Sequence, residues 1–564
     1  MTDMGAFRPI AAEEIEPADR PVDGAVPDVE EDDGIVIGQV VEIAGSSSRI
    51  AIDGSMLARV READDATLAM AGQVGSQVKV QVGDNWLIAN VRTLSADAGQ
   101  ANMVFAFIDF LGEGQKILGT QDVTNFRRGV TRYPVPGSPV LAVTDRDMQQ
   151  MFATDERPHI EIGTVYPTKD IRGALYVDPM LSKHFAVLGS TGTGKSTAVA
   201  LILHRICQLA PEAHIVMVDP HGEYSAAFKG AGEIFDVNNI ALPYWLMNFE
   251  EHCEVFVTAN GSESQRDRDI LAKCLLAARA KNKLGEEVPR LTVDSPIPYL
   301  LSDLLSLIQN DMGQLDAAKD IAPYARLKSK IEELKADPRY NFMFSGMLVA
   351  DTMPEFVAKI FRLPAHGKPI SIVDVSGVPS DITSVVVAVL SRMVFDYAIW
   401  SRNEAQRPVL LVCEEAHRYI PSGRDGGESA VGRILNRIAK EGRKYGVSLG
   451  LVTQRPSDLA EGVLSQCGTI LAMRLNNERD QAHVKAAMPE GARGFLDVIP
   501  ALRNRECIVC GEGVSVPIRI SFDTLEEEKR PASTDPKFSE LWTHVGDEPG
   551  IIDRTITRWR CQGR

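Results

Sequence analysis

The chain has 564 residues, of which 44% are hydrophobic and 24% are charged, and its formal net charge is −17. This is the composition of a soluble globular protein, and the length favours roughly two to four domains. Among apolar runs, none reaches the ~18 residues of a membrane span, and the first residues lack the basic start and apolar core of a signal peptide. We therefore expect no membrane association and a cytoplasmic location.

The negative charge is concentrated at the start of the chain. Residues 1–33 carry eleven acids and two arginines, a net charge of −9, which leaves −8 for the rest. The segment is rich in proline and acids and poor in aromatics, so it predicts a disordered acidic tail. The acidity does not exclude a nucleic-acid partner, but any basic surface must then be local, as in a pore or groove.

Residues 34–178 have the pattern of a separate β-rich region. Segments such as "GIVIGQVVEIAG" and "SQVKVQVGDNWLIANVRTL" alternate apolar and polar residues and break at glycine, serine and aspartate. This alternation is typical of short strands with one buried face. We predict a small β-barrel here, without a catalytic constellation, that serves assembly or partner docking.

Residues 179–520 change to near-continuous apolar runs separated by helical patterns. Such runs are typical of strands buried on both faces, so the region predicts an α/β fold with a mostly parallel sheet. A more polar helical stretch at about 250–365 predicts an inserted helical subdomain. The charged residues 521–564 predict a C-terminal arm. The apolar runs cover 184–190, 214–220, 370–377, 408–415, 447–454 and 468–475.

The strongest motif is "GSTGTGKST", between a predicted strand and a predicted helix. It fits the pattern G-x-x-x-x-G-K-[ST], in which backbone N–H groups wrap phosphates at a helix N-terminus. Lys195 is expected to reach the β- and γ-phosphates, and Ser196 to bind Mg²⁺. The motif predicts a RecA-like P-loop domain whose ATP-binding residues are Gly189, Ser190, Thr191, Gly192, Thr193, Gly194, Lys195, Ser196 and Thr197.

Two adjacent glutamates, Glu414 and Glu415, end the apolar run "PVLLVCEE". Paired like charges at the end of a buried strand are costly unless a positive charge lies against them. In P-loop NTPases an acid at the end of a neighbouring strand holds Mg²⁺, so we assign Glu414 to the metal. Side chains at a strand end alternate in direction, so Glu415 is expected to orient and deprotonate the attacking water. Lys195 and Mg²⁺ would offset the two charges.

Further polar residues follow the same edge of the predicted sheet. Gln454, in "LVTQRPSDL", is placed to contact the γ-phosphate or the attacking water. In "NRIAKEGRKYG", Arg443 is the candidate for an arginine inserted into a neighbouring subunit's site, with Arg474 as the second choice. Such an arginine raises the rate by about 10³–10⁵. The segment "VDPHGEY" brings Asp219, His221 and Glu223 to the phosphate edge, but their roles stay open.

Six motifs in this order resemble those of the HerA family, hexameric DNA-translocating ATPases of the FtsK–HerA group. They are "GSTGTGKST", "VDPHGEY", "PYWLMNF", "EEAHRYIP", "IAKEGRKYG" and "TQRPSDL". The resemblance covers roughly residue 34 to the end. It implies that Glu414 and Glu415 are the Walker B pair and that Arg443 acts in trans. The family's pair is often Asp-Glu, so the longer Glu414 fits if it reaches Mg²⁺ through water.

The same resemblance implies a homohexamer around double-stranded DNA, with a NurA-type nuclease or another effector on the barrel. The implied role is DNA end resection in repair or, with other effectors, phage defence. A translocating pore contacts phosphates, so DNA binding should be independent of sequence and sensitive to salt. The alternative is a P-loop scaffold or remodeller that acts on protein partners. Stimulation of ATP hydrolysis by duplex DNA distinguishes the two.

Overall fold

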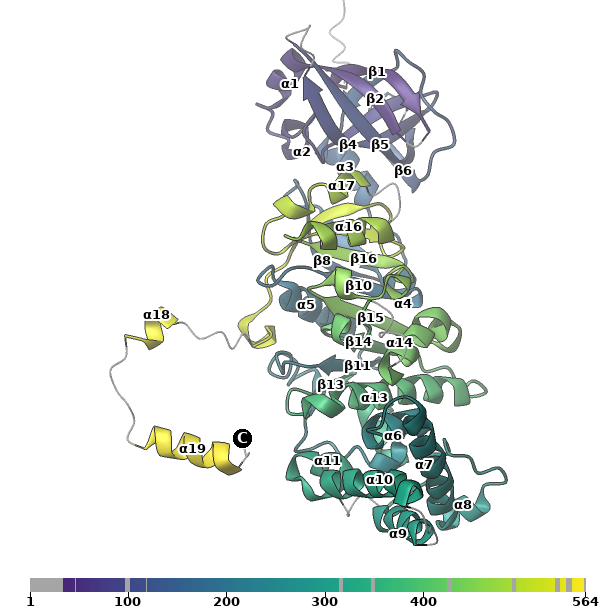
Figure 1. Ribbon diagram of the computed structural model, residues 1–564. Coiled ribbons are helices and arrows are strands. Elements are labelled where there is room, and N and C mark those ends of the chain that lie inside the picture. Colours follow the sequence, from purple (N-terminus) through teal and green to yellow (C-terminus); the bar gives the residue numbers. More distant parts are fainter. Residues whose placement is uncertain are drawn as a thin grey trace, which may run out of the picture.

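The molecule has three tiers, with a β-barrel at one end, a large sheet in the middle and a helical subdomain at the other end (Figure 1). The predicted acidic tail at 1–33 lies outside the described residues. The predicted α/β fold with an N-terminal barrel and a helical insertion is confirmed. The computed structural model describes residues 34–45, 47–96, 102–117, 119–313, 318–345, 350–422, 429–488, 493–532, 538–543 and 550–561.

Six antiparallel strands close the barrel in the order β2-β1-β7-β3-β4-β5, with β5 pairing back to β2. A further strand, β6 (Val123–Arg128), extends the sheet from β5. Closure leaves the six strands without a free edge, and their inward side chains form a core of their own. The six strands are β1 (Val36–Ala44), β2 (Ser47–Asp53), β3 (Gln77–Val82), β4 (Asn85–Ala96), β5 (Met103–Lys116) and β7 (Pro139–Ala142).

Three short helices accompany the barrel: α1 (Gly54–Val60), α2 (Ala66–Ala69) and α3 (Asp145–Phe152). A buried ion pair fixes the last of them to the strands. Lys79 of β3 donates to the carboxylate of Asp147 at 2.6 Å, and the backbone N–H of Val123 donates to the same carboxylate at 3.0 Å. Both charged side chains are almost fully buried, and a buried charge is tolerated only when it is paired in this way.

The central sheet has eleven strands in the order β12-β13-β11-β14-β15-β10-β16-β17-β18-β8-β9. The strands from β12 to β16 run parallel, and the last four are antiparallel. The parallel strands are β10 (Phe185–Leu188), β11 (His214–Asp219), β12 (Gly232–Phe235), β13 (Ile370–Asp374), β14 (Val409–Cys413), β15 (Val447–Thr453) and β16 (Thr469–Met473).

The boundary between barrel and ATPase domain lies earlier than residue 178. β8 (His159–Val165) and β9 (Arg172–Tyr176) do not join the barrel but extend the central sheet, because β8 pairs with β18 (Ile518–Phe522). The barrel strands end with β7 at Ala142. An alternating strand fits the edge of either sheet, so the sequence pattern could not assign these two strands. The remaining strand, β17 (Glu506–Gly511), links β16 to β18.

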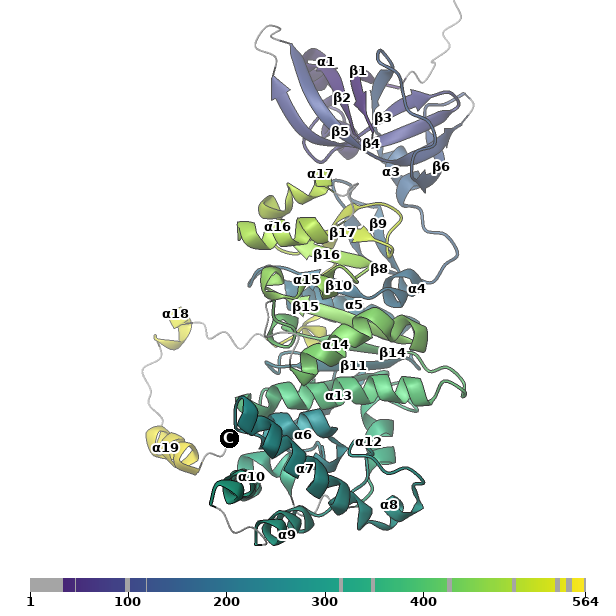
Figure 2. The ribbon, with the colours of Figure 1, turned by 45° about the vertical axis from the view of Figure 1, so that its right-hand side comes forward.

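Helices cover both faces of the central sheet (Figures 1 and 2). The longest, α13 (Ser380–Trp400), separates the sheet from the helical subdomain. By length and composition α13 could cross a membrane, but 67% of its apolar window is buried inside the protein, as in a core helix. The others are α4 (Val177–Ser182), α5 (Lys195–Leu209), α14 (Ala430–Glu441), α15 (Glu461–Leu464), α16 (Glu478–Ala487) and α17 (Arg493–Leu496).

Helices occupy the range predicted for the insertion, and the described parts of the predicted arm contain two more. The arm helices, α18 (Phe538–Leu541) and α19 (Ile551–Cys561), lie to one side of the molecule (Figures 1 and 2). The insertion helices are α6 (Phe249–Phe256), α7 (Ser262–Ala280), α8 (Lys283–Glu287), α9 (Leu301–Met312), α10 (Ala318–Ala336), α11 (Asn341–Phe344) and α12 (Met353–Ile360).

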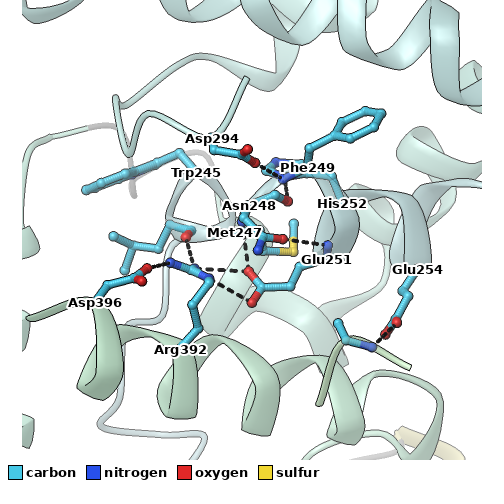
Figure 3. Close-up of polar contacts among 12 residues, drawn as sticks. Trp245, Met247, Asn248, Phe249, Glu251, His252, Glu254, Asp294, Arg392 and Asp396 are labelled. Carbon is cyan, nitrogen blue, oxygen red and sulfur yellow. Dashed lines mark hydrogen bonds and ion pairs between the residues drawn. The ribbon is translucent and has the colours of Figure 1, made fainter. Parts of the chain in front are cut away.

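One arginine of α13 anchors this insertion to the core (Figure 3). Arg392 donates to both carboxylate oxygens of Glu251 at 2.9 and 3.0 Å, and to the carbonyl of Leu246 at 2.6 Å. Glu251 also closes the capping box of α6 with Asn248. Its neighbour Glu254 accepts a hydrogen bond from the backbone N–H of Ala430, the first residue of α14 (Figure 3). The segment "PYWLMNF" and the helix α6 that follows it thus tie the insertion to two helices of the ATPase core.

Candidate active site

The P-loop lies at the carboxyl end of β10 and runs into α5. Gly192 and Gly194 have φ angles of 78° and 93°, a left-handed conformation that glycine adopts without steric cost. Strands on either side fix the loop, since Gly189 N–H donates to Thr453 of β15 and Ser190 N–H donates to the carbonyl of Arg474 after β16. The first turn of α5 has no side-chain cap, so its N–H groups are available to a phosphate.

The two predicted acids meet one lysine. Nζ of Lys195 lies 3.7 Å from Oε1 of Glu414 and 3.7 Å from Oε1 of Glu415. The three residues are only 8%, 4% and 6% exposed. In this low dielectric the lysine is the cation that the sequence required against the paired carboxylates.

The prediction that strand alternation points Glu414 and Glu415 in different directions is wrong. β14 ends at Cys413, and Glu415 has a φ of 51° and a ψ of 45° in the left-handed region. This turn brings Glu415 back toward the same lysine as Glu414, whereas simple alternation along a strand would send it to the opposite face of the sheet. A non-glycine residue in this conformation is strained, and such strain is concentrated at functional sites.

A second correction concerns the strand order. Glu414 does not follow the strand next to the P-loop strand, because β15 lies between β10 and β14. The intervening strand ends at Thr453, and the next residue, Gln454, accepts a hydrogen bond from the hydroxyl of Thr191 in the P-loop. Gln454 therefore lies at the phosphate edge, as the sequence predicts, and Lys195 reaches past β15 to the acids.

The electrostatic balance differs between the two acids. Burial, opposed by Lys195 and reinforced by Glu415, raises the pKa of Glu414 to about 7. Oε2 of Glu415 has no hydrogen-bond partner, although Nδ1 of His417 lies 3.2 Å from it. The same Nδ1 is 3.0 Å from the hydroxyl of Thr453, and burial lowers the pKa of His417. Glu415 thus keeps a free acceptor in the site, as a residue that takes a proton from water needs.

The structure assigns the segment "VDPHGEY" a part in this site through a residue that the sequence analysis did not select. Asp219 accepts backbone hydrogen bonds from His221, Gly222 and Tyr224, so its role is to shape the turn after β11. His221 is exposed, and no metal-ligand group of three or more His, Cys, Asp or Glu residues occurs in the described part of the chain. Tyr224, fully buried, donates to Oε2 of Glu414 at 3.0 Å.

The two candidate arginines lie in different places. Arg474 lies beside the P-loop of its own protomer, where its guanidinium donates to the carbonyl of Leu502 and to Oδ1 of Asn504. Arg443 is exposed in a short turn just before β15, at the opposite edge of the sheet. The seven residues of β15 span about 20 Å, so Arg443 does not meet the P-loop of its own protomer.

The donor set is suited to a magnesium ion. Ser196 and Glu414 offer hydroxyl and carboxylate oxygens, the ligands that Mg²⁺ prefers, and Mg²⁺ sites need only one or two protein ligands beside phosphates. Ser196 directly follows Lys195, whose Nζ lies 3.7 Å from Oε1 of Glu414. The two predicted metal-binding residues therefore belong to the same site.

Comparisons with known proteins agree with this geometry. Residues 160–394 match the family model "Helicase HerA, central domain". The chain is 28% identical to the DNA double-strand break repair helicase HerA of Pyrococcus furiosus, over 83% of this chain and 87% of that protein. The HerA helicase of Saccharolobus solfataricus is 26% identical over 74% and 78%. The chain is thus similar to HerA helicases over most of its length, and its central part matches the HerA central domain. It is an ATP-hydrolysing enzyme, which confirms the predicted enzyme class.

Among solved structures, VirB4 of Thermoanaerobacter pseudethanolicus aligns with this chain at a TM-score of 0.48 and 15% identity. The alignment covers 67% of this chain and 99% of that structure. The family match begins at residue 160, inside β8, and thus on the ATPase side of the corrected domain boundary.

The raised pKa of Glu414 predicts a pH-dependent stability of the nucleotide-free protein. Its folded-state pKa of about 7 exceeds the value of 4.5 for an unperturbed glutamate, so the folded state retains the proton and stability falls as the pH rises through 7. The side chain in Glu414→Gln is neutral at every pH, so this variant does not lose stability in this way as the pH rises. Its stability relative to wild type should be roughly 2–3 kcal/mol higher at pH 8.5 than at pH 5 in denaturant unfolding. An equal difference at both pH values would contradict the assignment.

The assignment of Glu415 predicts a separation of binding from hydrolysis. Glu415→Gln should bind ATP like the wild type but lower kcat by roughly 10²–10⁴, because only the proton acceptor is lost. Lys195→Ala, which removes the contact to the phosphates, should instead lose nucleotide binding. Equilibrium binding of a fluorescent ATP analogue and steady-state phosphate release measure the two effects. A kcat within tenfold of wild type for Glu415→Gln would exclude the general-base role.

Proposed function

We propose that this chain is an ATP-driven motor that translocates double-stranded DNA as a homohexamer in the cytoplasm. The Pyrococcus and Saccharolobus relatives bear the name of DNA double-strand break repair helicases, which supports DNA as the substrate and repair as the setting. Action with an effector in phage defence is the second setting that the family resemblance allows. The cytoplasmic location stays a prediction.

The observation that carries the proposal is that Arg443 lies at the edge of the sheet opposite to the P-loop of its own protomer. Lys195, Glu414, Glu415 and Gln454 gather at the carboxyl edge of the sheet, whereas Arg443 is exposed at the amino edge. In a ring of identical subunits, one protomer's amino edge would face the next protomer's P-loop. ATP hydrolysis would then depend on the subunit contact, which is the coupling that a ring motor needs.

Each residue has a defined task in this proposal. Lys195 neutralises the phosphates and holds the two glutamates in place. Glu415 accepts the proton of the attacking water through its free Oε2, and Gln454 links the end of β15 to the P-loop. A magnesium ion held through Ser196 and Glu414 would supply charge neutralisation at the phosphates. The arginine from the neighbouring subunit would stabilise the charge that develops in the transition state.

We further propose that a nuclease of the NurA type docks on the barrel. The barrel forms the end of the molecule remote from the helical subdomain (Figure 1). It exposes several large apolar side chains, which a docked protein would cover. They are Val36, Val41, Val74, Leu94, Phe107, Ile117, Tyr133 and Val135.

Duplex DNA should stimulate the ATPase activity of the full chain. The stimulation should be independent of sequence and should fall steeply between 50 and 200 mM salt, because phosphate contacts release counterions. Steady-state phosphate release with duplexes of different sequence measures both effects. If duplex DNA had no effect at low salt, the motor proposal would fail, and the protein-remodelling alternative would be favoured.

The position of Arg443 predicts that it acts across the subunit contact. Arg443→Ala should lower kcat by roughly 10³, and the exposed neighbour Lys444→Ala, as control, should not. A mixture of Arg443→Ala with Lys195→Ala should regain activity, because each variant supplies what the other lacks. In random 1:1 rings about a quarter of the interfaces would be complete. A mixture as inactive as its components would place the arginine's role within one protomer.

A further inference from the structure

Tyr224 is the buried aromatic residue of the "VDPHGEY" turn, and its hydroxyl is drawn into the active site. Its exposed fraction is 0%. The hydroxyl donates to Oε2 of Glu414 at 3.0 Å. A tyrosine hydroxyl has a single proton to donate, and here the carboxylate receives it.

The turn that carries Tyr224 is rigidly built. Asp219 uses Oδ1 for the N–H groups of His221 and Gly222, at 3.1 and 2.9 Å, and Oδ2 for the N–H of Tyr224, at 2.9 Å. Gly222 has a φ of 70°, and a Cβ on it would lie 2.8 Å from an oxygen of Asp374. Only a glycine fits there without strain. The turn therefore holds the tyrosine in one place.

The turn also lies beside the strand that carries the acids. β11 and β14 are neighbours, and the N–H of Glu414 donates to the carbonyl of Val218 at 3.2 Å. The tyrosine thus approaches Glu414 from a neighbouring strand. Its hydroxyl donates to Oε2 of Glu414, whereas Oε1 lies toward Lys195.

We propose that Tyr224 is a positioning residue that holds Glu414 in the orientation needed to bind the magnesium–nucleotide complex. This inference rests on the magnesium site of the proposed function. The hydroxyl distinguishes the two oxygens of Glu414, so that Oε2 is fixed by the protein and Oε1 faces Lys195 and the site. Preorganised oxygen ligands bind an ion without the cost of ordering them first.

The proposal differs from a purely structural role for a core tyrosine. Packing of the ring alone would be kept by phenylalanine, which has the same shape. The hydroxyl, however, donates to an active-site carboxylate, that of Glu414. Its removal would leave the buried Oε2 of Glu414 without a donor, and an unsatisfied buried acceptor is costly.

The test is nucleotide binding to the full chain with and without the ion, in the absence of DNA. The Kd of a fluorescent ADP analogue is measured in excess Mg²⁺ and in EDTA for wild type and Tyr224→Phe. The factor by which Mg²⁺ tightens binding should fall roughly tenfold in Tyr224→Phe, the loss expected for one hydrogen bond to a charged group. The Kd in EDTA should stay within twofold of wild type.

Tyr244→Phe is a matched control. Tyr244 is a buried tyrosine, 1% exposed, whose hydroxyl donates to the carbonyl of Tyr299 in the helical subdomain. It should lower thermal stability about as much as Tyr224→Phe but keep the wild-type Mg²⁺ factor. The inference is overturned if Tyr224→Phe keeps the full factor, if its binding in EDTA weakens equally, or if Tyr244→Phe loses the factor too.

The outcomes separate this inference from the proposed function. A wild type whose nucleotide binding did not respond to Mg²⁺ would overturn both the magnesium site and the role of Tyr224. A wild type that responds, with a Tyr224→Phe variant that responds equally, would overturn the role of Tyr224 alone. The DNA motor is tested by the DNA stimulation of hydrolysis, which this binding measurement does not involve.

Discussion

One buried lysine between two buried glutamates is the interaction on which the active site depends. Lys195 lies 3.7 Å from Oε1 of both acids, and all three side chains are less than one-tenth exposed. Two carboxylates against one ammonium leave an excess of negative charge. Burial raises the pKa of Glu414 to about 7, and the nearby Glu415 adds to the rise. A further cation would relieve this excess, so the site is suited to bind one together with nucleotide phosphates.

Two features of the backbone around these three residues build this site. The P-loop uses glycines in the left-handed region to turn its N–H groups inward, and β14 ends in a left-handed Glu415 that returns the second acid to the lysine. Both features need a rigid frame, because a strained backbone relaxes unless its surroundings hold it. The frame is a set of parallel strands whose side chains are buried on both faces.

The frame also connects the site to distant parts of the molecule. Arg392 of α13 binds Glu251 and Leu246 of the insertion, and Glu254 binds the first turn of α14. α14 leads directly to the turn with Arg443, at the edge of the sheet that would face a neighbouring subunit. A contiguous set of packed and hydrogen-bonded elements thus runs from the helical subdomain to the turn that carries Arg443. Coupling between two sites can travel through such a set.

The sequence by itself determined the local parts of this protein. The P-loop follows from eight consecutive positions, the buried strands from unbroken apolar runs, and the barrel from period-two alternation, because each of these signals is set by neighbouring residues. For the same reason, local motifs of the sequence identify Lys195, Glu414, Glu415 and Gln454 as site residues.

Only the tertiary structure decided the features that depend on pairing between distant residues. It placed β8 and β9 in the central sheet through the contact of Val165 with Ile520, and it inserted β15 between the P-loop strand and the acids. It brought the hydroxyl of Tyr224 to Glu414, 190 positions further along the chain. No sequence pattern contains these facts, since a strand's alternation is the same in either sheet and a buried tyrosine resembles any other core residue until its partner is known.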